Sequence, residues 1–246
     1  MFSDQAKIDY RSYYQNNQVS VDDTTRVGLM KHILRIINFK KLKNKNILEV
    51  GFGSGLLLKM LSRSCNEITG IDISKKNIDE LTTVLVKENL SPKLVQGDIL
   101  NLPLLDDIFD IIICAEVLEH VTNVNKAIQE LKRVTRPGGI MVISVPNEEI
   151  IKYEFCVHCR NLTPRNGHLN SFNREEFSSL LNSLGLKIEK TKIISSKIYA
   201  LSFLKIFYFT PFSVIIDIID RLISRYFHIF PPLLIIKIRK PDFIQD

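Results

Sequence analysis

The stretch Ile-Leu-Glu-Val-Gly-Phe-Gly-Ser-Gly at residues 47–55 has the residue types that allow close approach of a nucleotide or nucleoside-like ligand. Its apolar residues predict a buried strand, and Gly51, Gly53 and Gly55 end that strand. Glycines leave backbone N–H groups uncovered, and a helix-like run at residues 56–61 would turn the positive end of its dipole toward the ligand. Glycines also form ordinary tight turns, so the residues downstream decide the interpretation.

Two acidic residues follow the next predicted strands. Asp72 lies at the distance from the glycines at which a carboxylate typically accepts the two hydroxyl protons of a ribose. Asp98 follows Gly97 after the third predicted strand. Ligands of open α/β sheets bind beyond the carboxyl ends of the strands, so we expect both carboxylates at that edge.

Glu116, Glu119 and His120 follow the fourth predicted strand. Their spacing of i, i+3 and i+4 would place them on one face of a helical turn. Two carboxylates and an imidazole suit Mg²⁺ or another divalent ion. The same histidine can instead cap or pack at the start of a helix.

Cys156, Cys159 and His168 form a second cluster of ligand-type residues. A Cys-x-x-Cys pair with a nearby histidine provides three zinc ligands, and His158 would be a strained fourth. Complete structural zinc sites usually have two separated pairs, so a loop with free thiols is the other interpretation.

Strand and helix signals alternate between residues 46 and 145. The predicted strands are 46–50, 67–73, 93–96, 109–114 and 140–145, and the predicted helices between them are 55–64, 75–88 and 123–135. Such alternation is typical of an α/β fold with a doubly wound, mostly parallel sheet and helices on both faces. Downstream, Asn173 predicts the N-cap of a helix that stops at Gly185, and residues 186–194 and 233–239 predict two further strands.

The length of 246 residues suits one α/β core with additions. We assign the core to residues 44–195 plus 231–240. A helical arm or lid at residues 1–43 precedes it. A Cys/His insert at 150–172, expected to be irregular, lies within the core, and an apolar insert at 196–230 interrupts it.

The apolar insert approaches the length of a membrane span. Lys205 and Pro211 interrupt it, and it lies between two predicted strands of one sheet, which argues against a span. It is either a helical cap over a substrate pocket or an element at the membrane surface with Lys205, Arg221 and Arg225 near anionic headgroups. Both interpretations suggest an apolar or lipid-linked substrate.

Charge and cysteine usage narrow the partners and the compartment. The net charge is +6, but the lysines and arginines are scattered rather than gathered in a basic stripe with interleaved aromatics. No Asn/Asp-Pro-Pro-Tyr motif of base-flipping enzymes is present, so we expect no nucleic-acid partner. Four cysteines and a polar beginning without a signal peptide favour the cytoplasm, with peripheral membrane contact left open.

Taken together, the motifs resemble those of the class I S-adenosylmethionine-dependent methyltransferases. They look closest to the small-molecule group that includes the ubiquinone-pathway O-methyltransferases. The resemblance rests on Glu-Val-Gly-x-Gly-x-Gly, Gly-Asp, Glu-Val-Leu-Glu-His-Val and Arg-Pro-Gly-Gly, and covers about residues 45–195 plus 233–239. It implies a seven-stranded sheet of order 3-2-1-4-5-7-6 with the last strand antiparallel. The glycine spacing argues against a nicotinamide-binding Rossmann domain, which normally has its third glycine one residue later.

The resemblance also implies roles for individual residues. Glu49 would lie near the methionine amino group of S-adenosylmethionine, and the glycines beneath the cofactor. Asp72 would hold the ribose, Ile73 would contact the adenine, Asp98 and Ile99 would accept and flank its amino group, and Ala115 and Glu116 would line the methionine side. Some similar enzymes hold a metal with a triplet like Glu116, Glu119 and His120.

Two histidines are candidates for catalysis by this resemblance. His120 would lie beside the methyl group, where a base can deprotonate the acceptor. Gly167, His168 and Phe172 match a segment that borders the acceptor pocket in the family. We therefore expect a methyltransferase that acts on a small, apolar or lipid-linked acceptor, with transfer to oxygen favoured. The alternative is a methyltransferase-like module that binds without turnover.

Overall fold

The computed structural model describes residues 23–38, 42–63, 67–155, 162–194 and 232–242. Seven strands form the main sheet: β1 (Asn46–Val50), β2 (Glu67–Asp72), β3 (Lys93–Gln96), β4 (Phe109–Ala115), β5 (Thr135–Pro146), β8 (Lys187–Ile194) and β9 (Leu233–Arg239). Their order is β3-β2-β1-β4-β5-β9-β8, and β9 runs antiparallel to both of its neighbours. The predicted fold class and strand order are therefore confirmed.

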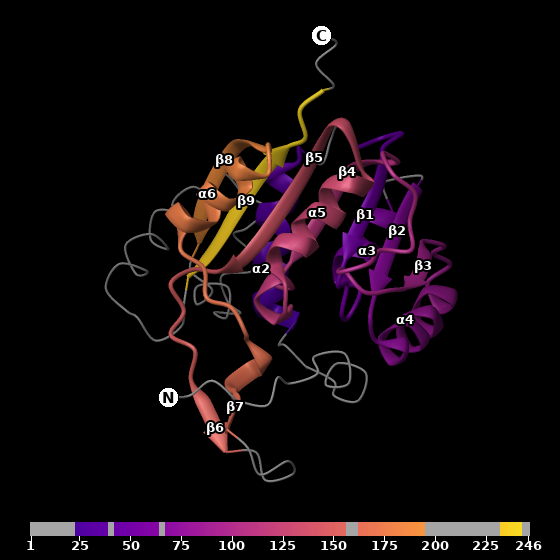
Figure 1. The fold of residues 1–246 in the computed structure, drawn as a ribbon. Coiled ribbons are helices and arrows are strands. Elements are labelled where there is room, and N and C mark those ends of the chain that lie inside the picture. The colour runs from indigo at the N-terminus through magenta and orange to yellow at the C-terminus, as the bar shows by residue number, and fades with distance from the viewer. Residues whose placement is uncertain (1–22, 39–41, 64–66, 156–161, 195–231, 243–246) are drawn as a thin grey trace, which may run out of the picture.

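Within the described residues, five helices cover the two faces of this sheet (Figure 1). They are α2 (Asp23–Ile36), α3 (Leu56–Ser62), α4 (Lys75–Lys87), α5 (Val124–Val134) and α6 (Arg174–Ser183). Residues of α5 and α6 belong to one apolar cluster, and residues of α2, α3 and α4 belong to the other. Alternate residues of β4 divide between the clusters, with Ile112 on one face and Ile111 and Ile113 on the other. The central strand is thus buried on both sides, as its continuous apolar run predicts.

Asparagine or serine side chains cap the first turn of α4, α5 and α6. Asn173 caps α6 by accepting a hydrogen bond from the Glu176 backbone N–H at 2.8 Å, and Gly185 follows the helix with a φ of 69°. Both features confirm the sequence prediction. Ser74 caps α4 and Asn123 caps α5 in the same manner.

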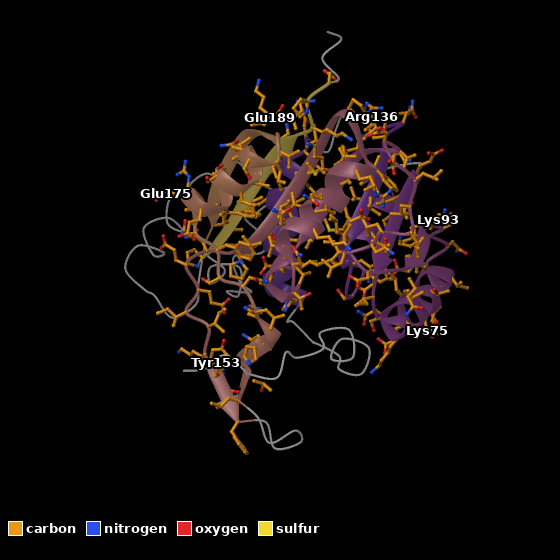
Figure 2. The ribbon with its side chains drawn as sticks, in the orientation of Figure 1. Lys75, Lys93, Arg136, Tyr153, Glu175 and Glu189 are labelled. Atoms are coloured by element: carbon orange, nitrogen blue, oxygen red, sulfur yellow. The ribbon has the colours of Figure 1, made fainter. Side chains whose placement is uncertain are left out.

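The segment predicted to be irregular, residues 150–172, contains a short hairpin, so that part of the prediction was wrong. Strands β6 (Tyr153–Phe155) and β7 (Leu162–Pro164) pair antiparallel, and a 3-10 turn at Arg165–Gly167 follows. Figure 2 shows Tyr153 on this hairpin, far from Arg136 at the opposite end of the sheet. The pairing is only three residues long, which is too short for an alternating pattern to be visible in the sequence.

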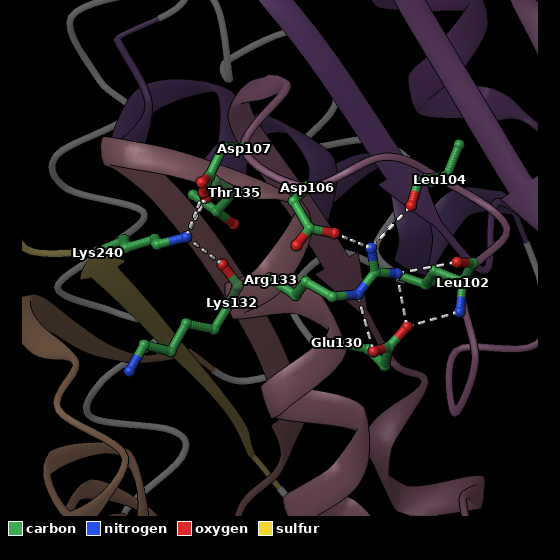
Figure 3. Close-up of polar contacts among 9 residues, drawn as sticks. All are labelled: Leu102, Leu104, Asp106, Asp107, Glu130, Lys132, Arg133, Thr135 and Lys240. Atoms are coloured by element: carbon green, nitrogen blue, oxygen red, sulfur yellow. Dashed lines mark hydrogen bonds and ion pairs between the residues drawn. The ribbon is translucent and has the colours of Figure 1, made fainter.

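A polar network fastens the amino end of β5, away from the carboxyl ends of the parallel strands (Figure 3). Arg133 donates to the Glu130 and Asp106 carboxylates and to the carbonyl oxygens of Leu102 and Leu104. Lys240, just after β9, donates to the carbonyl oxygens of Lys132 and Thr135 and to Asp107. These contacts tie α5, the loop before β4 and the last strand together.

Three predicted segments lie partly or wholly outside the described residues, one of them the Cys/His insert, of which residues 156–161 are not described. The apolar insert at 196–230 is outside them, and so are residues 1–22 of the predicted arm. Within the described ranges, no helix is long and apolar enough to cross a membrane.

Candidate functional site

The turn between β1 and α3 is built from glycines in left-handed backbone conformations. Gly51, Gly53 and Gly55 have φ values of 71°, 53° and 70°. The Gly51 N–H donates to the Ile71 carbonyl oxygen at 2.8 Å, which carries the turn from β1 across the end of β2. A Cβ atom on Gly51 would lie 2.4 Å from Cγ2 of Val117, so the turn packs directly against the segment that follows β4. Helix α3 is only seven residues long, so its dipole is weaker than the sequence suggested.

Asp72 is buried at the end of β2 and is bonded to this turn. Its Oδ2 accepts a hydrogen bond from the Gly53 N–H at 3.0 Å. Its Oδ1 accepts from the Ser74 N–H at 2.9 Å and from the Asn77 side-chain amide at 3.3 Å. The aspartate therefore shapes the glycine turn, and its predicted contact with a ribose stays a prediction.

Asp98 and its neighbours continue the same edge of the sheet. The Gly97 N–H donates to the Asp72 carbonyl oxygen at 3.0 Å, which joins the end of β3 to the end of β2. Asp98 Oδ1 accepts from the Leu100 N–H at 2.9 Å. Ile99 is buried and Ile73 packs against the core beside it. The four residues predicted to hold the nucleoside thus lie together.

Glu49, Ala115 and Glu116 form the β1–β4 side of the edge. Glu49 is 4% exposed. Glu116 has a left-handed φ of 57°, its N–H donates to the Ser144 carbonyl oxygen at 3.0 Å, and its Oε1 accepts from the Ser144 hydroxyl at 3.1 Å. Strand β5 therefore fixes the orientation of the Glu116 carboxylate.

The predicted arrangement of Glu116, Glu119 and His120 on one helical turn was wrong. Glu116 is not helical, because its backbone is left-handed, and only Leu118–His120 form a 3-10 turn. The ligand atoms of Glu119 and His120 instead meet that of His168, and the three lie within 4.8 Å of one another. A loop nearly fifty residues downstream replaces Glu116 in the cluster.

Asn170 holds that downstream loop in place, a role that the sequence did not reveal. Its side-chain amide donates to the carbonyl oxygens of Val121 at 2.7 Å and Leu118 at 3.1 Å. The backbone N–H groups of Leu169 and Asn170 both donate to the Glu119 carbonyl oxygen, at 2.6 and 3.0 Å. The loop is therefore bonded to the carbonyl oxygens of Leu118, Glu119 and Val121 in the segment that follows β4.

The two histidines lie against each other in this cluster. Their ring centroids are 4.8 Å apart and the ring planes meet at 70°. Nδ1 of His120 is 3.2 Å from the Gly167 carbonyl oxygen, and Nε2 of His120 is 3.8 Å from Glu119 Oε1. Nδ1 of His168 is 2.5 Å from Oε2 of Glu149. Glu149, three residues after the end of β5, was not singled out in the sequence.

The described residues include Cys114 but neither member of the Cys156–Cys159 pair. Cys156 and Cys159 lie outside those residues, so a zinc set with His168 stays a prediction. Cys114 is fully buried. Its burial is the main cause that raises the pKa of its thiol far above the ordinary value, and the nearby Glu119 and Glu116 carboxylates raise it further. A thiol held protonated in this way is no nucleophile.

The carboxylates at this edge of the sheet fit S-adenosylmethionine. Glu49, Asp72 and Asp98 offer acceptors for an ammonium group, ribose hydroxyls and an amino group, and their negative charge favours a cationic sulfonium. The same charge disfavours the pyrophosphate of a dinucleotide.

Comparison with known proteins shows which proteins this chain is similar to. Residues 48–143 match the family described as "Methyltransferase domain". The ubiquinone biosynthesis O-methyltransferase of Rickettsia prowazekii is 27% identical over 194 residues, which is 76% of this chain and 77% of that protein. The enzyme of the same description from Rickettsia typhi is 30% identical over 162 residues, which is 63% of this chain and 65% of that protein.

Solved structures match over more of the chain. The cyclase SpnF superposes with a TM-score of 0.65 at 19% identity and covers 93% of this chain and 86% of its own. An S-adenosylmethionine-dependent methyltransferase from Mesorhizobium loti gives 0.58 at 15% identity, covering 87% of this chain and 97% of its own. At these identities the likeness is one of fold.

Proposed function

We propose that this chain, which belongs to the class I S-adenosylmethionine-dependent methyltransferases, methylates a hydroxyl oxygen of a small, largely apolar acceptor. The observation that carries the proposal is the contact between Gly51 and Val117. It brings the carboxylate-lined glycine turn next to the segment that bears His120 and, through Asn170, next to His168. A nucleoside-type site and a pair of imidazoles thus share one edge of the sheet.

The protein has two tasks in such a reaction. When bound, S-adenosylmethionine supplies a methyl group that is already activated on a sulfonium. The chain must therefore align the acceptor and take up its proton. Alignment contributes roughly 7–11 kcal/mol when it is near ideal, and a positioned base adds on the order of 10²–10⁴ in rate.

We assign the binding of the cofactor to the carboxylates. Asp72 would accept hydrogen bonds from the ribose, Asp98 from the adenine amino group and Glu49 from the methionine ammonium. Ser144 holds the Glu116 carboxylate by a hydrogen bond, and we assign Ala115 and Glu116 to the methionine side of the cofactor and the two histidines to the acceptor side.

An apolar, lipid-linked acceptor is supported by composition and by exposure. The sequence of 198–219 is dominated by aromatic and aliphatic residues. Around the hairpin, Ile150, Phe155 and Leu162 are 83%, 64% and 56% exposed. The relatives are named for ubiquinone biosynthesis, whose O-methyltransferase step suggests a phenol or catechol as the acceptor here.

We keep the cytoplasm as the proposed compartment, and the same exposed residues support peripheral contact of the protein with a membrane. Exposed apolar side chains gathered on one projecting element are typical of interaction surfaces. Co-sedimentation with vesicles of phosphatidylglycerol and phosphatidylcholine checks this. Phe155→Ser should reduce pelleting, whereas the exposed Val86→Ser on α4 should not. Equal pelleting of both variants, or none of the wild type, contradicts the proposal.

A divalent ion held by Glu119, His120 and His168 is a second candidate role for the cluster. One carboxylate and two imidazoles within 4.8 Å suit such an ion, which would lower the pKa of the acceptor hydroxyl. Turnover that is lost on dialysis against EDTA and restored by Mg²⁺ or Zn²⁺ would establish it.

The proposed activity is tested by methyl transfer from isotope-labelled S-adenosylmethionine to octylcatechol, an apolar catechol, with octylamine as the nitrogen counterpart. We expect a labelled methyl ether and no methylated amine. Cofactor binding with no transfer to either probe would favour the alternative, a methyltransferase-like module that binds without turnover.

A further inference from the structure

We propose that Glu149 is a positioning residue that holds His168 as the Nδ1–H tautomer, which makes Nε2 of His168 the atom that takes the proton from the acceptor. This inference rests on the proposed methyl transfer to oxygen. It names the proton acceptor and the residue that prepares it.

The contact between the two side chains defines which nitrogen carries the proton. Oε2 of Glu149 is 2.5 Å from Nδ1 of His168, and each side chain is 14% exposed. An ionised carboxylate can only accept a hydrogen bond, so the hydrogen atom between the two groups belongs to the imidazole nitrogen. The proton therefore stays on Nδ1, and the lone pair of the neutral ring lies on Nε2.

The carboxylate of Glu149 is delivered by a fixed backbone. The hydroxyl of Ser171 donates to the Glu149 carbonyl oxygen at 2.7 Å, and the Glu148 N–H donates to the Phe172 carbonyl oxygen at 2.7 Å. Asn147 pairs with Phe172 as an isolated bridge. The hydrogen bond of Glu148 is part of that bridge, so the bridge and the Ser171 hydroxyl tie the end of β5 to the loop that carries His168 at two points, which reduces the entropy lost in orienting the pair.

The other histidine is less suited to the same task. Glu119 Oε1 lies 3.8 Å from Nε2 of His120, on the nitrogen that an acceptor proton would have to reach. Nδ1 of His120 faces the neutral carbonyl group of Gly167. In His168 the carboxylate lies at the nitrogen opposite the reacting one, where it stabilises the imidazolium that forms.

Methyl transfer to the acceptor oxygen conserves the proton and every electron pair. The acceptor O–H bond breaks and its proton moves to Nε2 of His168. The electron pair of that bond forms the new bond from oxygen to the methyl carbon, and the pair of the broken carbon–sulfur bond stays on sulfur. The products are a methyl ether, S-adenosylhomocysteine and a His168 imidazolium beside the Glu149 carboxylate, and the partly exposed ring returns its proton to water.

The tautomer can be observed directly, without turnover. We would record long-range ¹⁵N–¹H correlations of histidine-labelled protein at a pH about two units above the ordinary imidazole pKa. His168→Asn identifies the resonances, because the chain has five histidines. The variants compared are Glu149→Ala and, as a matched control, Glu148→Ala, which removes an exposed carboxylate next in the chain.

We expect the Nδ1–H form of His168 in the wild type and in Glu148→Ala, and loss of that preference in Glu149→Ala. An Nε2–H ring in the wild type, or an unchanged ring in Glu149→Ala, overturns the inference. The wild-type spectrum decides the matter even if Glu149→Ala does not fold.

Kinetics with octylcatechol separate this inference from the proposed function. Glu149→Ala should lower kcat on the order of 10² while KM and the affinity for S-adenosylmethionine stay unchanged. Wild-type protein that binds no S-adenosylmethionine refutes the proposed function, whatever tautomer His168 adopts. Turnover that disappears in EDTA and returns with Mg²⁺ assigns Nε2 to a metal and overturns the role as proton acceptor.

Discussion

Replacing Asn170 by alanine should destabilise the protein and displace His168 without disturbing the cofactor end of the site. The asparagine amide donates two good hydrogen bonds, to the carbonyl oxygens of Val121 and Leu118, and both of those residues are buried. A lost hydrogen bond costs about 1 kcal/mol, and a buried group left unsatisfied costs about 1–3 kcal/mol. We therefore expect Asn170→Ala to lower the free energy of unfolding by about 2–4 kcal/mol.

Urea unfolding followed by circular dichroism measures this change. Asn182→Ala, at an exposed position of α6, is the matched control and should stay within about 0.5 kcal/mol of the wild type. Asn170→Asp should be worse than Asn170→Ala, because a carboxylate would face the two carbonyl oxygens. Asn170→Ala should also lower kcat with octylcatechol while binding S-adenosylmethionine normally. A destabilisation no larger than that of the control would refute the view that this side chain clamps the loop.

Three further predictions concern other parts of the structure. The hydrogen bond from Arg133 holds the pKa of Glu130 below its ordinary value. Glu130 should therefore stabilise the fold fully at pH values above its unfolded-state pKa, and this contribution is lost as the pH falls through its lower folded-state pKa. The free energy of unfolding of Glu130→Gln, measured as the pH is lowered, should lack this component. Gly51→Ala should cost about 1–3 kcal/mol in urea unfolding, part of it recovered by adding Val117→Ala. Cys114 should resist alkylation in the native protein and react only on unfolding, as peptide mass mapping would show; native labelling would contradict its burial.

Much of the fold could be predicted because its signals are local. The apolar runs of β1 and β9 stand out against their neighbours, and the predicted bounds of these two strands and of β3 match the structure. The cap at Asn173 depends on residues three apart, so it too was visible in the sequence. Hydrophobic periodicity and helix capping each depend on residues that are only a few positions apart in the sequence.

The part of the site that could not be predicted depends on contacts between distant segments. The hydrogen bond from Ser144 to Glu116 crosses 28 positions, and those from Asn170 to the segment after β4 cross about fifty. Glu116 has a left-handed backbone conformation, which is uncommon for a residue other than glycine. The amino-acid sequence gives no sign of it. The pairing of Glu149 with His168 likewise becomes visible only when the two chain segments are in place.

The central claim is that the edge formed by Glu49, Asp72 and Asp98 binds S-adenosylmethionine. Calorimetric titration of the wild-type protein tests it most directly, with NADH and with the S-adenosylmethionine analogue that lacks both ribose hydroxyls as comparisons. Because Asp72 also shapes the glycine turn, changing the ligand is more informative than changing the aspartate. The account predicts binding of S-adenosylmethionine, at least tenfold weaker binding of the analogue and none of NADH, since one lost charge-assisted hydrogen bond costs about 1.5–3 kcal/mol. Equal binding of the analogue, or preference for NADH, would contradict it.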